Sequence, residues 1–390
     1  MKVLLIHNLY LERGGEDTVV AQELSLLLGR GHEVVPAYFN NAEIKTPLDR
    51  ARAAFRVSHS RAAAEALQTM AEKFRPDVAH VHNFFPLVTP GAIGALAECG
   101  VPIVQTLHNF RVVCPGGLLM RNGQPCEDCL GTSRRAALRW RCYRDSTAGS
   151  AAVAYMGRTF RRMAERNREF VTLVALTRFA KSRFVADGFD EDQVVVRPNF
   201  APDIGAGPEK RGPRLLYVGR LSHEKGAETV VRAAAAVDGI VEIVGDGPET
   251  ARLRAMASPN VIFAGRISRE EVGSKLRNAA AVLVPSRWYE GFPMIVAEAM
   301  AAGTPILAAR IGSLAEIVED RETGWLLPID DIQAWAHAMR SVLTDPEQLV
   351  RWGQKARRTY ESLYNEESGY RSLIEIYQRA IKQREVSLRQ

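Results

Sequence analysis

Long hydrophobic runs are missing from this 390-residue sequence, and it has only five cysteines. No apolar stretch approaches the about 18 residues that a membrane span requires, and no charged, apolar and small-residue leader precedes the first apolar run. A protein that spans a membrane or is secreted is therefore not expected, and a cytoplasmic location is the default. With 46% hydrophobic and 25% charged residues, the chain has the composition of a soluble protein and is long enough for two domains with full cores.

The sequence offers little support for a dinucleotide or metal site from short motifs. Gly14 and Gly15 follow the first apolar run, but the turn does not match the dinucleotide pattern G-x-G-x-x-G. The only D-x-D runs from Asp190 to Asp192 in a predicted turn, and we interpret it as solvated surface. Neither motif therefore predicts a cofactor or a metal.

Short apolar runs alternate with helical periodicity along most of the chain. In the first half the runs cover 3–7, 34–39, 78–82, 103–108, 172–176 and 194–197, with helical patterns at 17–28 and 55–74. After a stretch rich in Pro and Gly, the alternation restarts with RLLYVGR, IVEIVGDG, VIFAGRIS, AVLVPSRW and PILAAR, and from residue 332 only helical periodicity remains. The pattern predicts two doubly wound α/β domains, each with a parallel sheet covered on both faces. Such sheets bind ligands at the carboxyl ends of their strands, and two of them facing each other make a cleft.

The composition shifts give the predicted domain boundaries. We expect a first Rossmann-like domain at 1–199, with an insertion rich in cysteine and arginine at about 111–168. Residues 200–213 predict a linker, and 214–364 a second domain. A C-terminal helix is expected at 365–390, packing back on the first domain.

Residue types suited to phosphates follow several predicted strands. Gly14 and Gly15 open a helix whose first N–H groups can hold an anion, although the glycines could equally shape a tight turn. Arg220 and Lys225, in VGRLSHEKG, can bind a diphosphate and stabilise charge on a leaving group, the alternative being a solvated loop. The glycines of VGDGP and GRIS would let the backbone approach a flat base.

Two glutamates stand in RWYEGFPMIVAEAMAAGTPI with seven residues between them. Pro293 and Gly303 bound a predicted helix, so Glu290 precedes the helix and Glu298 lies inside it among apolar neighbours. A buried carboxylate requires a partner, either a core arginine or a pair of ligand hydroxyls. The about 7 Å of helix rise before Glu298 favours one end of an elongated ligand for each glutamate over an acid/base pair.

These segments together resemble a known family. GGED, GRLSHEKG, VGDGP, EGFPMIVAEAMAAGTPI and GSLAEIVEDRETGWLLP are similar to the family-4 retaining glycosyltransferases of the GT-B fold, over nearly the whole chain. The resemblance implies transfer of a sugar from a UDP- or GDP-sugar donor to a glycan or lipid-linked acceptor, with retained configuration and no cofactor or metal required for catalysis. It also implies a role in cell-surface polysaccharide or glycolipid synthesis, with the first domain meeting the acceptor.

The resemblance also assigns roles to residues. Glu298 would bond the ribose hydroxyls, and Glu290 the transferred sugar. The catalytic residues implied are His108, Arg220, Lys225 and Glu290. The donor-binding residues implied are Gly14, Gly15, Gly219, Asp246, Gly247, Arg266, Ile267, Gly291, Phe292, Pro293 and Glu298. In two places the chain departs from the family: Asn109 replaces the usual Asp, which leaves the role of that carboxylate open, and Phe200 replaces a Gly, which leaves the hinge open.

Four other functions remain open at this point. A GT-B sugar-nucleotide epimerase or a phosphorylase would share the diphosphate site, although a phosphorylase would need a cofactor lysine and a longer chain. A glycoside hydrolase would need two carboxylates about 5 to 10 Å apart facing one bond. A protein that binds sugar nucleotides without catalysis would have no use for two cations at the diphosphate.

Four cysteines form the pattern C-x11-C-x2-C-x12-C inside the arginine-rich insertion. A C-x2-C pair with two further cysteines can hold a tetrahedral structural zinc, and a cytoplasmic location disfavours disulfides. Four unpaired thiols are the equal alternative. The predicted ligands are Cys114, Cys126, Cys129 and Cys142.

Positive charge is concentrated between Arg134 and Arg168, where ten arginines stand against two acidic residues. Val153, Met156, Phe160 and Met163 recur there at helical spacing, which is typical of a helix on an anionic membrane surface. The alternative, which we favour slightly, is that this apolar stripe packs on its own domain. We expect no nucleic-acid partner, and a location in the cytoplasm or peripheral at the inner membrane face. The His80 and His82 pair is expected to be packed or to face a sugar rather than to bind a metal.

Overall fold

The computed structural model describes residues 1–11 and 14–387 and divides into two compact units. Unit 1 comprises residues 1–119, 126–198 and 370–390, and unit 2 comprises residues 120–125 and 199–369. Each unit is built on a six-stranded parallel sheet, which confirms the predicted α/β class with two doubly wound sheets.

The sheet of unit 1 has the strand order β2-β1-β3-β4-β7-β8. Successive strands run outward in one direction from β1 and in the other from β3, so the switch point lies between these two. Strands β3, β4 and β7 are buried on both faces, as runs of Val, Ile and Leu in a parallel sheet should be. The strands are β1 (Lys2–Leu9), β2 (Glu33–Asn40), β3 (Val78–Val81), β4 (Ile103–Leu107), β7 (Val171–Ala175) and β8 (Val194–Val196).

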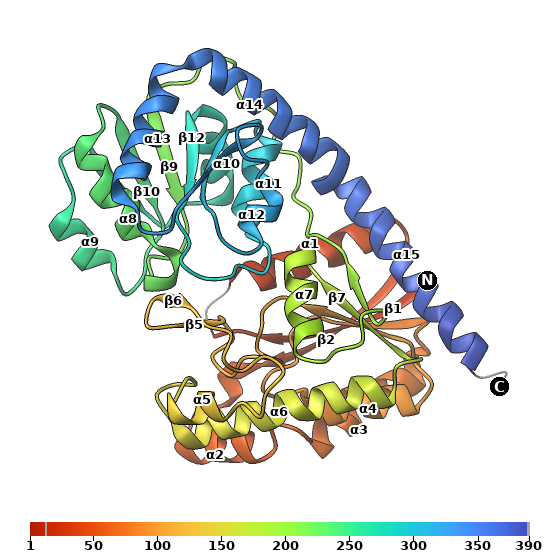
Figure 1. The fold of residues 1–390 in the computed structure, drawn as a ribbon. Coiled ribbons are helices and arrows are strands. Elements are labelled where there is room, and N and C mark those ends of the chain that lie inside the picture. The colour runs from red at the N-terminus through yellow and green to blue at the C-terminus, as the bar shows by residue number, and fades with distance from the viewer. Residues whose placement is uncertain (12–13, 388–390) are drawn as a thin grey trace. The chain divides into compact units, whose positions relative to one another are not determined.

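The helices of unit 1 cover both faces of its sheet. Helices α3, α4 and α6 pack together in one layer (Figure 1). On the opposite face, α15 contributes Leu373 and Tyr377 to a core cluster with Leu27 of α1 and Val104 of β4. The helices are α1 (Gly15–Gly29), η1 (Asn41–Glu43), α2 (Pro47–Phe55), α3 (Arg61–Phe74), α4 (Thr89–Glu98), α5 (Arg135–Arg139), α6 (Thr147–Arg166), α7 (Arg178–Ala186) and α15 (Glu366–Ser387).

The sheet of unit 2 has the order β11-β10-β9-β12-β13-β14. This is the Rossmann order, and its switch point lies between β9 and β12. The strands are β9 (Arg214–Val218), β10 (Ile240–Val244), β11 (Val261–Gly265), β12 (Ala281–Val284), β13 (Ile306–Ala309) and β14 (Gly324–Leu327). A short antiparallel pair, β5 (Met120–Arg121) and β6 (Gln124–Pro125), is counted with this unit.

The helices of unit 2 alternate with its strands and then continue alone. They are η2 (His223–Lys225), α8 (Ala227–Ala233), η3 (Ala234–Ala236), α9 (Thr250–Met256), α10 (Arg269–Asn278), α11 (Met294–Ala301), α12 (Leu314–Ile317), α13 (Ile332–Thr344), α14 (Pro346–Thr359) and the π-helical η4 (Tyr360–Tyr364). Helix α10 begins with a capping box in which Ser268 and Glu271 satisfy each other's backbone N–H groups.

Several sequence predictions need correction or comment. The helix predicted at 55–74 is confirmed over 61–74 as α3, but its start is wrong, because α2 ends at Phe55 and Ser60 caps α3 by accepting a hydrogen bond from the N–H of Ala63. Residues 200–213, predicted as a linker, belong to unit 2, where Arg211 donates to the carbonyl groups of Ala302 and Gly303. The end of the predicted C-terminal helix, 388–390, lies outside the described residues.

The apolar stripe of α6 is buried in unit 1. Val153, Met156, Phe160 and Met163 are at most 7% exposed, and α6 packs on α4 and α5. The alternative in which this stripe packs on its own domain is therefore the observed one. No helix in the described part of the chain combines the length and apolarity that a membrane crossing requires.

Candidate active site

The switch point of unit 2 brings together a lysine and a glutamate from two different loops. Lys225 follows β9 and Glu290 follows β12, and these strands are neighbours in the sheet. Lys225 Nζ donates to Glu290 Oε1 at 2.7 Å, and the hydroxyl of Ser286 donates to the same oxygen, also at 2.7 Å. The structure therefore places two of the predicted catalytic residues in direct contact, at the edge of the sheet where α/β folds bind ligands.

The two partners differ in their access to solvent. The Glu290 side chain is buried, whereas that of Lys225 is 29% exposed. The ammonium lies 5.3 Å from the ring centroid of Trp288, which shields one side of it. An ammonium has three protons, so Lys225 can keep its bond to Glu290 and still donate to an anion that reaches it from solvent.

Glycine at position 226 lets the two loops approach each other. The backbone of Gly226 has φ +67°, and a Cβ there would lie 2.0 Å from the carbonyl oxygen of Pro285. Any other residue would therefore push the loop after β9 away from the loop after β12. The glycine directly after Lys225 is thus a requirement of the contact between Lys225 and Glu290.

The other predicted catalytic cation of unit 2 has a different setting. Arg220 is exposed and its carbonyl accepts a hydrogen bond from the hydroxyl of Tyr217 at 3.0 Å. Burial, and then the charges of Glu290 and Glu224, raise the pKa of Tyr217. Tyr217 is therefore a neutral donor that fixes the backbone at Arg220 and leaves the guanidinium at the surface.

Glu298 lies on α11, half-buried, after a buried turn formed by Gly291, Phe292 and Pro293. Burial raises the pKa of its carboxyl group, and the charge of Arg269 opposes this. Among the described residues no hydrogen bond or ion pair reaches this carboxylate. The predicted core arginine is thus not observed as a bonded partner, and the oxygens are available to the hydroxyls of a ligand.

The remaining predicted donor-binding residues surround the ends of β9, β10 and β11. Asp246 is exposed and accepts hydrogen bonds from Thr250 and from the N–H of Gly247, so its carboxylate shapes its own turn. A Cβ at Gly247 would lie 2.4 Å from the carbonyl oxygen of Leu221, so the strand ends are closely packed. Gly219 follows β9, while Arg266 and Ile267 follow β11.

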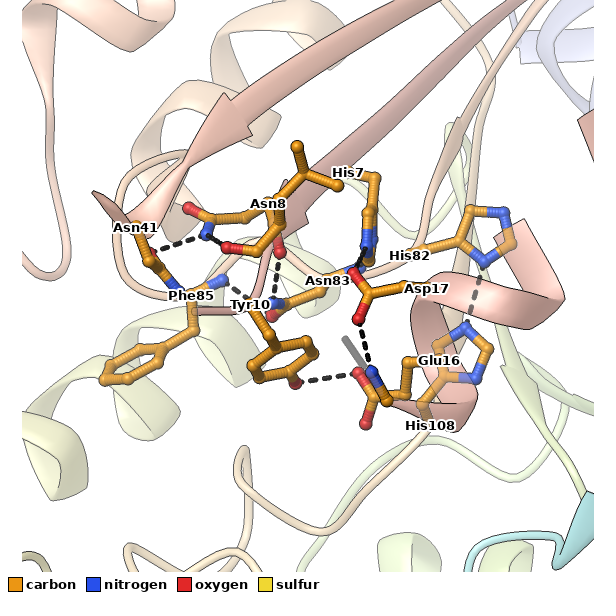
Figure 2. A network of polar contacts seen from close by, with 12 residues as sticks. His7, Asn8, Tyr10, Glu16, Asp17, Asn41, His82, Asn83, Phe85 and His108 are labelled. Atoms are coloured by element: carbon orange, nitrogen blue, oxygen red, sulfur yellow. Dashed lines mark hydrogen bonds and ion pairs between the residues drawn. The ribbon is translucent and has the colours of Figure 1, made fainter. Parts of the chain in front are cut away.

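The switch point of unit 1 carries neutral side chains and buried charges. His7, near the end of β1, donates from Nε2 to Asp17 Oδ1 at 3.0 Å, while its Nδ1 accepts from the N–H of Asn83 at 3.3 Å. Asn83 in turn donates to the carbonyl of Asn8 at 2.6 Å. Figure 2 shows this network from β1, β3 and α1.

The loop at Gly14 and Gly15 begins α1 through a different contact from the predicted one. The N–H of Gly14 donates to Asp17 Oδ2 at 2.8 Å, which is one half of a capping box, because Gly14 has no side chain to return the bond. One N–H at this helix start thus has an internal acceptor, and both glycines are exposed. Their role in donor binding stays a prediction.

Glu16 explains one departure from the family pattern. Its two oxygens accept from the hydroxyl of Tyr10 at 2.7 Å (Figure 2) and from the side-chain amide of Asn109 at 2.8 Å. An aspartate at position 109 would place a second carboxylate against Glu16 instead of a donor. The asparagine therefore matches this chain's own neighbouring glutamate.

His108 follows β4 and contacts a second histidine. Its Nε2 lies 2.9 Å from Nδ1 of His82 (Figure 2), and both rings are buried. Burial lowers the pKa of His108, of His82 and of the adjacent His80. These imidazoles are therefore neutral at pH 7 and act as one donor and one acceptor each.

The sequence analysis missed several residues of both sites. Their types are ordinary in loops and on helix surfaces, and only the place of some of them after parallel strands could have indicated a site. In unit 2, Arg287 is buried and pairs with Asp330 at 2.6 Å, next to His223. The missed residues are His7, Tyr10, Glu16, Asp17, Glu23, Asn83, Ser286 and Arg287.

The cysteines and the histidines are the two groups that could hold a metal. All five cysteines are free. Within the described residues, the ligand atoms that lie within 4.8 Å of one another are those of Glu23, His80 and His82. The four predicted zinc ligands do not form such a group in this structure.

Comparisons with known proteins give the following matches. Residues 14–199 match the family model described as Glycosyl transferase 4-like domain, and residues 204–359 match the one described as Glycosyl transferases group 1. Glycogen synthase of Mycobacterium tuberculosis is 29% identical over 315 residues, which cover 78% of this chain and 69% of that protein. D-inositol 3-phosphate glycosyltransferase of Mycobacterium sp. (strain KMS) is 29% identical over 283 residues, covering 69% of this chain and only 59% of that protein.

The solved structures show the same fold over almost the whole chain. HepE of Anabaena, determined in complex with UDP, superposes with a TM-score of 0.68 and covers 96% of this chain and 99% of its own. The sequence identity is 17%, so this likeness concerns the fold alone.

Proposed function

Because this chain is a member of the family-4 glycosyltransferases of the GT-B fold, we propose that it transfers a sugar from a nucleotide sugar to an acceptor hydroxyl and retains the anomeric configuration. The observation that carries the proposal is the Lys225–Glu290 pair at the switch point of unit 2. A cation that is partly exposed beside a buried carboxylate suits a ligand with a diphosphate at one position and sugar hydroxyls at the next.

Each charged residue of unit 2 has a proposed role in donor binding. Lys225 and Arg220 neutralise the diphosphate, and this stabilisation increases as negative charge develops on the leaving group. Glu290, held by Lys225 and Ser286, accepts from hydroxyls of the transferred sugar. Glu298 accepts from the ribose hydroxyls, which would supply the partners that its carboxylate lacks among the described residues.

Retention and independence from metals are parts of the same proposal. In a retaining transfer without a side-chain nucleophile, the departing diphosphate itself can accept the proton of the acceptor hydroxyl. Arg220 and Lys225 then take the role that a divalent cation has in other glycosyltransferases. UDP and UDP-glucose are bound in solved structures of the similar HepE, which supports a UDP-sugar as the first donor to test.

The function is tested by incubating the protein with a panel of UDP- and GDP-sugars and bacterial membrane extract, and by measuring released nucleotide and product. Release that depends on an acceptor, and that does not depend on added Mg²⁺, is expected. Conversion of the donor to an epimer would instead identify a sugar-nucleotide epimerase. Tight binding of donor without any turnover would identify a binding protein.

The acceptor is proposed to be lipid-linked, at an anionic membrane. Helices α2 and α5 pack on α6. Three aromatic side chains of these helices are exposed: Phe55 at the end of α2 (90%), Trp140 directly after α5 (45%) and Tyr155 on α6 (58%). We define the basic group as these three aromatic residues with the exposed arginines of α2, α5 and α6 and of the turns that follow α2 and α5. These are Arg50, Arg52, Arg56, Arg135, Arg139, Arg141, Arg144, Arg158, Arg162 and Arg166.

Exposed aromatic and arginine side chains can together bind an anionic bilayer, at about 1 kcal/mol for each basic residue near the surface. Flotation with liposomes should show binding that rises with anionic lipid and falls when Arg158, Arg162 and Arg166 are replaced by Gln. The matched control replaces the exposed Arg232, Arg351 and Arg358 of unit 2 and should leave flotation unchanged. Equal losses in both triple variants would point to net charge alone, and flotation that does not respond to anionic lipid would favour a soluble acceptor.

Zinc binding by the cysteine cluster is a further proposal. Cys114 and Cys129 are buried, and burial raises the pKa of Cys129 to about 12, with added effects of the thiols of Cys114, Cys142 and Cys126. A divalent cation would remove this penalty by binding the thiolates, after rotation of side chains that lie beyond ligand distance here.

Elemental analysis of protein purified without chelator is expected to give one zinc per chain. Cys129→Ser should lose the zinc, and Cys99→Ser, a cysteine outside the cluster, should keep it. A wild-type protein without zinc would leave the alternative of four free thiols as the correct one.

A further inference from the structure

A chain of three side chains leads from the core of unit 1 to His108. Glu23 on α1 has one carboxylate oxygen, Oε1, bonded to Arg197 at 2.5 Å. Its other oxygen, Oε2, lies 3.4 Å from Nε2 of His82. His82 Nδ1 lies 2.9 Å from Nε2 of His108. Glu23 and Arg197 are at most 1% exposed, and His82 2%, so water does not compete for these contacts.

The charge state of this chain is fixed by burial. Burial favours the neutral acid form of Glu23, but the positive charge of Arg197 holds its pKa below the usual value. The carboxylate is therefore ionised and accepts hydrogen bonds only. Burial keeps both histidines neutral, so each ring carries one proton whose position is set by its neighbours.

The carboxylate decides where these protons lie. A lone pair on His82 Nε2 would face the negative oxygen of Glu23, whereas an N–H there is attracted to it. With its proton on Nε2, His82 has a bare Nδ1 that accepts a hydrogen bond. The Nε2 of His108 must then be the donor, which leaves Nδ1 of His108 without a proton.

We propose that Glu23 and His82 are positioning residues that fix the tautomer of His108, so that His108 presents Nδ1 as an acceptor for a hydroxyl of the sugar. Among the described residues Nδ1 has no hydrogen-bond partner of its own. That a sugar hydroxyl is the donor rests on the function proposed above, whereas the tautomer itself does not.

A metal ion on Glu23, His80 and His82 is the competing arrangement, since their ligand atoms lie within 4.8 Å of one another. Three contacts oppose it. Arg197 already neutralises Glu23, and both nitrogens of His80 have partners, Nδ1 with the hydroxyl of Tyr377 and Nε2 with that of Thr106, each at 2.8 Å. Neither ring nitrogen of His80 is therefore available to bind a metal.

The substitution Glu23→Gln tests the proposal because it should invert the whole chain. The glutamine oxygen accepts from Arg197, so its amide group faces His82 as a donor. His82 then accepts at Nε2 and donates from Nδ1, and His108 accepts at Nε2 and carries its proton on Nδ1. The change in the side chain's size is small, but the hydrogen-bond direction is reversed.

The tautomers are measured in the full chain labelled with ¹⁵N-histidine, by long-range ¹H–¹⁵N correlation, with signals assigned from His82→Phe and His108→Gln. We expect a protonated Nε2 on His108 in the wild type and a protonated Nδ1 in Glu23→Gln. Asp17→Asn, the matched control, should change His7 and leave His108 unaltered. A wild-type His108 protonated on Nδ1, or one unchanged by Glu23→Gln, would overturn the proposal.

Further tests distinguish the tautomer proposal from a folding defect and from a metal site. If Glu23→Gln does not fold, His82→Phe removes the acceptor and should leave both tautomers of His108 populated; a single unchanged tautomer there would also contradict the proposal. If the purified protein contains stoichiometric metal that a His80→Gln variant loses, the proposal is wrong and the cluster is a metal site.

In the transfer assay Glu23→Gln should lower kcat/KM about 10-fold with an unchanged affinity for the nucleoside diphosphate. A correct tautomer without any transferase activity would refute the proposed function and leave this inference standing.

Discussion

The two units have the same architecture but differ in how far the charged side chains at their switch points are exposed to solvent. Each has six parallel strands and a switch point where its polar residues gather. In unit 2 the switch point holds an ion pair whose cation is 29% exposed. In unit 1 it holds three buried, neutral histidines, His80, His82 and His108, near a fully buried Glu23–Arg197 pair. Six of the eight histidines in the chain lie in unit 1.

This difference indicates what each switch point can bind. A partly exposed ammonium can neutralise an anionic ligand, because it loses little hydration until the ligand arrives. Buried neutral imidazoles cannot neutralise a phosphate, but they can recognise a hydroxyl through one donor or one acceptor of fixed direction. Two six-stranded parallel sheets are thus fitted to a charged ligand in one unit and to neutral hydroxyls in the other.

The largest expected effect is in unit 2. Lys225→Ala should lower the transfer rate roughly 100- to 1000-fold, by analogy with the loss of about 3 to 4 kcal/mol when a preorganised donor to developing charge is removed. Glu290→Gln and Arg220→Ala should also abolish most transfer while the fold survives. The measurement is steady-state release of nucleotide, with thermal unfolding to confirm the fold.

The chain offers a closely matched control for Lys225. Lys275 pairs with Glu242 at the same 2.7 Å and with a similar exposure of 30%, but it lies on α10, outside the predicted site. Lys275→Ala should leave the transfer rate within about twofold. A similar loss in both variants would show that these lysines act through stability rather than through ligand binding.

The second effect is acid sensitivity confined to unit 1. In the unfolded chain, histidines bind protons below about pH 6.5, whereas burial lowers the pKa values of His80 and His82 in the folded state. The unfolded state then binds more protons, so the free energy of unfolding decreases as the pH falls from 6.5 towards the lowered values. Together the two histidines lower the free energy of unfolding by roughly 3 kcal/mol for each pH unit below about 6.

Urea unfolding at pH 7.5 and 5.5 can distinguish the units, because four of the five tryptophans lie in unit 2. Circular dichroism should report an early transition of unit 1 at pH 5.5, while tryptophan fluorescence follows a transition that changes little. Parallel shifts of both signals would contradict the comparison.

The smallest effect concerns Asn109. Asn109→Asp should lower the stability of unit 1 by about 1 to 3 kcal/mol, because a donor to Glu16 is replaced by a second carboxylate. The double variant Glu16→Gln with Asn109→Asp should restore most of the loss, as measured by urea unfolding. A single variant as stable as the wild type would indicate that Glu16 takes up a proton or turns away.

The fold class and half of the site could be predicted from the sequence. Alternating apolar runs and helices are enough to predict two parallel sheets. Lys225 and Glu290 lie in the loops that follow β9 and β12, which are neighbours in the sheet. Strand β14 (Gly324–Leu327) was missed, because its sequence GWLL begins with glycine, which is uncommon in strands, and contains no β-branched residue.

The polar network of unit 1 could not be predicted in the same way. Glu23 lies in a helical pattern where glutamate is normally solvated, and nothing local indicates that Arg197, 174 residues later, would meet it in the core. The exposed positive charge of the arginine-rich segment was overestimated for the same reason, because some of its arginines meet partners that are distant in the sequence. Arg134 is a buried partner of Asp187 at 2.6 Å, and Arg161 bonds the backbone of Asp187, so only part of that charge is available at the surface.

The central claim, that the switch point of unit 2 binds the diphosphate of a nucleotide sugar, is tested most directly by calorimetric titration of the wild-type chain, Lys225→Ala and Lys275→Ala with UDP and with GDP. We predict that one of the two nucleotides binds the wild type and Lys275→Ala alike, and binds Lys225→Ala at least 10-fold more weakly. Equal affinity in all three proteins, or no binding of either nucleotide to the wild type, would contradict the account.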